Sequence, residues 1–205
     1  MRCVNRTISF FHYGLSQIIN IRLEEGRNQN GSRGDEEWIR PEEGWMKVNC
    51  DGAFSTNEEG NKRKEVGLGV VVRDGSGRVV TRVAIKMRLK SCLEAEAAAL
   101  REGVFLAESM GIQKIMLETN FEIMFKELEK GKEKWNWKIM PYIQDLLGKK
   151  DCFEGIKISK IKRSTNKTID WFKTSQTWDE LDKLGVFTPS SLVHILSKDG
   201  LPAPC

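Results

Sequence analysis

The sequence has little of what builds a zinc site or a disulfide framework. It holds two histidines, and its five cysteines are scattered along 205 residues with no Cys-x-x-Cys pair. This pattern disfavours both kinds of site and indicates a reducing, intracellular environment. Long apolar runs are also missing, and none approaches the roughly 20 residues that a membrane-spanning helix needs. We therefore expect no membrane partner.

An excess of one charge is missing too. The net charge is +4 with a pI near 8.8, which permits nucleic-acid binding without requiring it. A hydrophobic content of 40% and a charged content of 30% are typical of a globular protein. The length predicts one domain with tails, and we expect a monomer.

Composition divides the chain into three parts. Residues 1–40 read as a leader and linker without stable structure, residues 44–180 as the folded domain, and residues 181–205 as a tail. The first 23 residues are basic and contain no acid. Two interpretations of them stay open: an organelle transit peptide, or a poorly ordered leader.

Hydrophobic periodicity predicts the elements of the domain. Alternation indicates strands, helical spacing indicates helices, and the sequence Asp74-Gly75-Ser76-Gly77 is typical of a hairpin turn. The expected strands are residues 45–50, 66–73, 79–89, 114–119 and 155–163. The expected helices are residues 91–110, 121–128 and 141–147, and one that starts near residue 166.

This order of elements predicts an α/β fold with a five-stranded mixed sheet flanked by helices. The first three strands should be antiparallel, and crossover helices should place the last two parallel to the first. Asp51 and Asn120 follow apolar stretches at expected strand ends, and Glu96 lies on the helix expected to cover that edge. Because ligands gather at the carboxyl ends of such strands, we expect these three residues to converge.

Three motifs carry a resemblance to a known family. They are Trp45-x-Lys47-x-Asn49-x-Asp51-Gly52-Ala53, Gly67-x-Gly69-x-x-x-Arg73-Asp74-x-x-Gly77 and Ala95-Glu96-Ala97-x-Ala99-Leu100-Arg101-Glu102-Gly103. With them, residues 44 to about 175 resemble the ribonuclease H-like domains of plants, many of which derive from non-LTR retrotransposons. The resemblance implies a ribonuclease H-like fold and hydrolysis of the RNA strand of an RNA–DNA hybrid.

The resemblance also implies a site of four carboxylates holding two Mg²⁺ ions, with Mn²⁺ as a substitute. Asp51, Glu96 and Asp170 take three of those places, and Asn120 stands where the family has its third acid. Magnesium prefers hard oxygen ligands, and two such ions can clamp the attacking and leaving oxygens. Glu94 is a fallback for Glu96.

Three departures from the family pattern bear on activity. Asn120 keeps a carbonyl oxygen but lacks the negative charge of an acid. Lys160 occupies the place of the family's accessory histidine and cannot exchange a proton near neutral pH in the same way. Trp171-Phe172 replaces the usual Leu-Ala after Asp170 and predicts different packing of the last helix.

Basic residues near Asp170 favour contact with nucleic acid, most simply an RNA–DNA hybrid. They are Lys157, Lys160, Lys162, Arg163 and Lys167, with Asn166 among them. Two alternatives to a nuclease stay open: a nucleic-acid-binding domain without turnover, and a scaffold or pseudogene product. For the scaffold, Trp135, Trp137 and Trp178 would mark a partner surface, although burial in the core explains tryptophans more simply.

Overall fold

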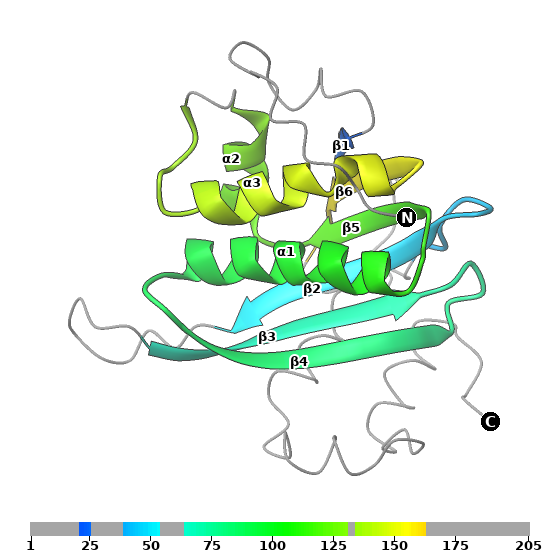
Figure 1. The fold of residues 1–205 in the computed structure, drawn as a ribbon, viewed down its shortest axis with the longest axis horizontal. Helices are drawn as coiled ribbons and strands as arrows, with labels where there is room; N and C mark the ends of the chain where they lie inside the picture. Colours follow the sequence, from blue (N-terminus) through cyan, green and yellow to red (C-terminus); the bar gives the residue numbers. More distant parts are fainter. Residues whose placement is uncertain (1–20, 26–38, 54–63, 131–133, 163–205) are drawn as a thin grey trace, which may run out of the picture.

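One six-stranded mixed sheet forms the centre of the protein (Figure 1). The computed structural model describes residues 21–25, 39–53, 64–130 and 134–162. The strands are β1 (Ile21–Glu25), β2 (Met46–Ala53), β3 (Lys64–Arg73), β4 (Val79–Leu89), β5 (Lys114–Thr119) and β6 (Gly155–Lys160), in the spatial order β1-β6-β5-β2-β3-β4.

The five strands expected from the sequence are present with the expected directions. β2, β3 and β4 are antiparallel, β5 runs parallel to β2, and β6 runs parallel to β5. The tight turn between β3 and β4 lies where the sequence predicts it, with Gly77 N donating to Asp74 O at 2.9 Å and Gly77 at φ +86°. The predicted α/β fold class is confirmed.

The sixth strand, β1, lies within the segment that composition assigns to the leader and linker. It pairs parallel with β6, from Ile21 opposite Ile156 to Glu25 opposite Lys160. Without it β6 would be an edge strand with unpaired backbone groups among the described residues. The sequence Ile-Arg-Leu-Glu alternates apolar and charged residues, which is a strand signal that composition alone passes over.

Three helices lie beside the sheet: α1 (Cys92–Ser109), α2 (Glu122–Glu129) and α3 (Met140–Gly148), followed by the short 3-10 helix η3 (Lys150–Cys152). α1 lies in front of β2 and α3 lies beside α1 (Figure 1), and α1 also packs against β3. Close packing of α1 on β2 depends on small residues: a Cβ on Gly103 would lie 2.6 Å from Cys50 Sγ. None of the helices in the described ranges combines the length and apolar composition needed to cross a bilayer.

The two faces of the sheet differ in polarity. Val48 and Cys50 on β2, with Leu117 on β5, face α1 and join the apolar core. Because side chains alternate along a strand, the intervening residues of β2 project from the opposite face. There Lys47, Asn49 and Asp51 are polar, yet all three are buried.

Candidate functional site

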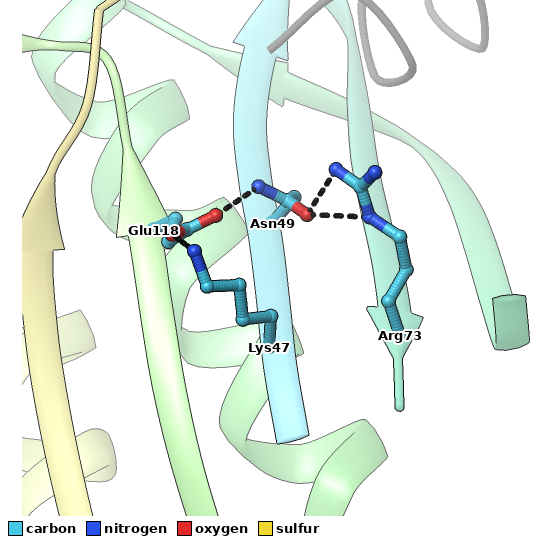
Figure 2. A network of polar contacts seen from close by, with 4 residues as sticks. All are labelled: Lys47, Asn49, Arg73 and Glu118. Atoms are coloured by element: carbon cyan, nitrogen blue, oxygen red, sulfur yellow. Dashed lines mark hydrogen bonds and ion pairs between the residues drawn. The ribbon is translucent and has the colours of Figure 1, made fainter. Parts of the chain in front are cut away.

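Four polar side chains from three strands form a buried network on the face opposite α1 (Figure 2). Asn49 is at its centre: its Nδ2 donates to Glu118 Oε2 at 2.7 Å, and its Oδ1 accepts from Arg73 Nη2 at 2.8 Å and Nε at 3.2 Å. Lys47 Nζ makes an ion pair with the other oxygen of Glu118. We call Lys47, Asn49, Arg73 and Glu118 the buried network.

All four members are almost inaccessible to solvent, with Asn49 and Arg73 fully buried. Charges in such surroundings are tolerated only when hydrogen bonds and opposite charges compensate them. Asn49 supplies that compensation from both ends of its amide, since it joins the carboxylate on β5 to the guanidinium on β3 (Figure 2). The network therefore links β5, β2 and β3 in one register.

Asp51 lies one row beyond the network on the same face of β2. The pairing of β2 with β5 ends at Asn49 opposite Glu118, whereas its pairing with β3 continues through Asp51 opposite Gly69 to Ala53. The expectation that this strand ends at residue 50 is therefore wrong, because β2 continues to Ala53. What ends before Asp51 is the parallel pairing, and this leaves Asp51 at the carboxyl end of β5.

Gly52 brings the end of β2 against the first turn of α1. A Cβ at Gly52 would lie 2.7 Å from both the backbone carbon and the Cβ of Ala95, so only glycine fits without displacing the helix. Asp51 precedes Gly52, and Glu96 follows Ala95. The contact thus brings the two chain segments that carry the candidate acids together, and both acids are buried.

The end of β5 contributes to the same place. Asn120 Nδ2 lies 3.5 Å from Asp51 Oδ2, and Thr119 Oγ1 lies 3.4 Å from Glu96 Oε2. Thr119 Oγ1 also accepts from the backbone N–H of Phe121 at 3.1 Å, which fixes the turn into α2. We call Asp51, Glu96 and Asn120 the candidate site. Asp170, its expected fourth member, lies outside the described residues.

The thiol of Cys50 lies near enough to three acids for their charges to affect its pKa. Burial raises its pKa well above the ordinary value of 9.0, and the negative charges of Glu96, Asp51 and Glu118 raise the pKa further. Three carboxylates from α1, β2 and β5 are therefore within electrostatic reach of one buried sulfur atom.

Glu94, the alternative to Glu96, has a structural role. Its backbone N–H donates to Ser91 Oγ at 3.2 Å, and its carboxylate accepts from the backbone N–H of Lys90 at 2.8 Å. Together these bonds resemble a capping box, which satisfies N–H groups at the start of a helix. The carboxylate is thus directed to the start of α1, and Glu96 is the better candidate.

The basic residues predicted to contact nucleic acid near β6 differ in their exposure to solvent. Lys157 is buried, makes an ion pair with Glu42 at 2.9 Å and lies 4.5 Å from the ring centre of Trp45, so the expectation of a phosphate contact there is wrong. Lys160 is half-buried opposite Thr119, and Lys162 is exposed. The other predicted members, Arg163, Asn166 and Lys167, lie outside the described residues.

The tryptophans divide in the same way. Trp135 is buried, and its indole N–H donates to the backbone oxygen of Lys130 at 2.7 Å. Trp137 is 74% exposed. Core burial thus explains Trp135 but not Trp137, and Trp178 lies outside the described ranges.

The donor chemistry of the candidate site suits a hard divalent cation. It offers two carboxylates and an amide, whose carbonyl oxygen is also a hard ligand. Within the described ranges, no group of three or more His, Cys, Asp or Glu side chains is arranged to hold a metal ion. Asn120 explains part of this result, because an acid in its place would add a third carboxylate beside Asp51.

Sequence reasoning missed the buried network as a unit. Lys47 and Asn49 appear in the first motif and Arg73 in the second, but nothing in those motifs says that the three meet. A usable signal exists in β2, where Lys47, Asn49 and Asp51 alternate with apolar residues in a strand that has neighbours on both sides. Polar residues at every second position of a central strand indicate that they form hydrogen bonds with polar side chains of the neighbouring strands.

A family model decides the identity of the domain. The model described as reverse transcriptase-like matches residues 49–175, which include the candidate site. The chain belongs to the reverse transcriptase-like family. No curated protein matches the chain.

Solved structures of ribonucleases H and of a viral reverse transcriptase are similar in fold to this reverse transcriptase-like domain. RNase H1 from the halophilic archaeon Halobacterium salinarum is 20% identical with a TM-score of 0.55, over 68% of this chain and 98% of that one. LC11-RNase H1, solved in complex with an RNA/DNA hybrid, is 15% identical with a TM-score of 0.56, over 66% and 99%. A foamy viral protease-reverse transcriptase, also with an RNA/DNA hybrid, is 13% identical with a TM-score of 0.51, over 75% and 23%. The fold is ribonuclease H-like.

Proposed function

We propose that this protein binds RNA–DNA hybrids and hydrolyses their RNA strand at Asp51, Glu96, Asn120 and Asp170. The observation that carries the proposal is the contact of Gly52 with Ala95, which gathers two buried acids at the carboxyl end of β5 in a ribonuclease H-like fold. Two of the similar structures were solved with RNA/DNA hybrids.

In this proposal Asp51, Glu96 and Asp170 hold two Mg²⁺ ions, for which Mn²⁺ can substitute. When bound, such ions activate a water molecule and stabilise charge on the leaving oxygen. The residues of the chain would hold and orient the ions. Asp51 and Glu96 present oxygen atoms from β2 and α1, which Gly52 keeps in contact. Asn120 presents an uncharged amide beside Asp51.

Asn120 should weaken the reaction. The loss of one charge from the metal ligands, with Lys160 in place of an assisting histidine, is expected to cost on the order of 10² to 10⁴ in rate. The same observation favours the alternative function, a domain that binds nucleic acid without cutting it.

Cleavage of a labelled RNA–DNA hybrid by the full chain tests the proposal. We expect slow cleavage that requires Mg²⁺ or Mn²⁺, is lost in Asp51→Asn and rises in Asn120→Asp. Binding without cleavage by the wild type, together with cleavage by Asn120→Asp, would support the alternative. Cleavage that Asp51→Asn leaves unchanged would refute the assigned site.

Two further proposals concern origin and location. The motifs shared with plant domains favour descent from a non-LTR retrotransposon, and a phylogeny of the domain tests this. The first 23 residues are basic and acid-free, which favours either import into an organelle or a leader that is unstructured up to the start of β1 at Ile21. Fluorescent fusions with and without residues 1–20, a deletion that leaves β1 complete, distinguish import from an unstructured leader.

A further inference from the structure

The edge strand β4 carries cations without nearby acids in the sequence. From Val79 to Leu93 the chain contains Arg82, Lys86, Arg88 and Lys90 and no acidic residue. The first acid after them is Glu94, which is buried at the start of α1. Such a charge pattern on an edge strand leaves positive charge facing solvent.

The register of β3 and β4 shows which face these cations occupy. Met87 lies opposite Val66, and Val66 belongs to the apolar core beneath α1. Because side chains alternate, Lys86 and Arg88 project from the other face, which also carries Asp51. Lys86 lies opposite Gly67, so no side chain of β3 stands beside it.

Lys86, Arg88 and Lys90 are all exposed. Among the described residues none of the three makes an ion pair or a side-chain hydrogen bond, whereas Arg82 is half-buried and has other contacts. On β3, Glu65 stands opposite Arg88 in register. Three cations against this one acid give the stretch an excess of positive charge. We call Lys86, Arg88 and Lys90 the β4 cation row.

The row leads into the candidate site. Lys90 is followed by Ser91, the residue that caps α1, and Glu96 lies in the second turn of that helix. Along a strand, side chains on one face repeat every 6 to 7 Å, roughly twice the rise per residue. Lys86 and Arg88 stand at that spacing, and Lys90 follows just beyond the end of β4. Neighbouring cations that outnumber the acids around them complement a chain of phosphates better than a single anion.

We propose that the β4 cation row binds the phosphate backbone of the nucleic acid that enters the candidate site. This deepens the proposed function, because it rests on nucleic acid being the ligand, but it does not depend on cleavage. Each residue contacts a phosphate without reading bases, so the row supplies affinity and orientation rather than sequence preference.

The test compares two variants of the full chain that lose the same charge. One is K86Q/R88Q/K90Q, and the matched control is K126Q/K134Q/K138Q, which alters three exposed lysines elsewhere. Binding of a fluorescent RNA–DNA hybrid is measured at several salt concentrations with EDTA present, so that no cleavage occurs. Unchanged thermal unfolding checks that both variants fold.

The row variant should bind roughly 10- to 1,000-fold more weakly at low salt, and its slope of log affinity against log salt should fall by about 2 to 3. The control variant should keep more of the wild-type affinity and more of the wild-type salt dependence. Equal slopes in the two variants would overturn the proposal, as would wild-type protein that binds no nucleic acid. Competition by polyglutamate as effective as that by the unlabelled hybrid would also overturn it, because the row would then recognise acidic polypeptides.

The assay separates this inference from the proposed nuclease. If the row variant bound the hybrid more weakly, but neither wild type nor Asn120→Asp cleaved it in Mg²⁺ or Mn²⁺, the phosphate-binding role of the β4 cation row would stand and the proposed nuclease activity would be refuted. Cleavage with the same dependence on hybrid concentration in wild type and row variant would retain the nuclease and refute the row.

Discussion

Two neighbouring rows of side chains serve different purposes, one at the last paired position of β2 and β5 and one just beyond it. In one, Asn49 and Glu118 meet at 2.7 Å inside the buried network; in the next, Asp51 and Asn120 approach only to 3.5 Å. The first row contains both signs of charge and is joined to Arg73 and Lys47 by hydrogen bonds and an ion pair. The second combines a buried carboxylate with a neutral amide.

The difference indicates that successive side chains on this face of β2 have different roles, one structural and one in ligand binding. The buried network satisfies its own polar groups, so it holds strands in place and leaves little capacity for a ligand. In the candidate site an amide and a hydroxyl lie 3.5 and 3.4 Å from the two carboxylates, and a hard cation would bind those carboxylates more strongly. The network therefore prepares the register on which the site depends, and mutations in the two rows should have different effects.

The largest expected effect on stability comes from breaking the network. Glu118→Gln should destabilise the protein by about 3–5 kcal/mol, because it leaves the ammonium group of Lys47 buried without its opposite charge. Urea unfolding measures this. Glu122→Gln, which removes an exposed carboxylate paired with Lys126, is the control and should leave the midpoint unchanged. Similar midpoints for the two variants would contradict a closed network.

A smaller loss is expected where the candidate site meets α1. Gly52→Ala should cost about 1–3 kcal/mol, because its Cβ would collide with the backbone of Ala95 and displace the helix that carries Glu96. Differential scanning calorimetry provides the measurement. Gly75→Ala is the control, since a Cβ there meets nothing within 4 Å and its φ is not positive. Equal melting temperatures would show that β2 and α1 do not need this approach.

The turn between β3 and β4 lies outside both rows and should matter less. Asp74 is partly buried, which raises its pKa, but hydrogen bonds from Ser76 and Arg78 outweigh this and lower the pKa below 3.8. A lowered pKa stabilises the fold above the unfolded value and loses that effect as pH falls through the folded value. Asp74→Ala should therefore cost about 0.5–1 kcal/mol at pH 7 and progressively less below pH 4, as measured by urea unfolding at each pH.

The smallest expected effect is chemical. The thiol of Cys50 has a raised pKa and is fully buried in the core beneath α1, so it should resist alkylation at pH 8 in the native protein. Cys92 and Cys152 are partly exposed and should react before Cys50. Mass spectrometry of peptides after brief iodoacetamide treatment measures the order. Early labelling of Cys50 would contradict the tight packing of β2 on α1.

The sequence was sufficient for the fold because its signals were local. Alternation, the Asp74–Gly77 turn and the alanine-rich helix each follow from spacing along the chain, and the structure confirms the elements that they predict. β1 was missed because five residues inside a polar stretch were judged by composition, whereas their pairing with β6 is made across the whole domain.

The candidate site was predictable in its residues but not in its construction. Asp51, Glu96 and Asn120 were named from motifs, and the structure brings the segments that carry them together. The role of Gly52 was not predicted, because a sequence does not reveal that Ala95 lies against it. The sequence likewise did not reveal that Glu118 belongs to the buried network, since its partners lie 69 and 71 residues away.

The most direct test of the candidate site is the thermal stability of wild type, Asn120→Asp and Asp51→Asn with and without Mn²⁺. Without metal, Asn120→Asp should be less stable than wild type, because it places a second carboxylate beside Asp51. Saturating Mn²⁺ should reverse that order, with a gain of about 2.7 kcal/mol at 100 times the dissociation constant, and Asp51→Asn should not respond. If Mn²⁺ stabilised all three proteins equally, Asp51 and Asn120 would not belong to a cation site.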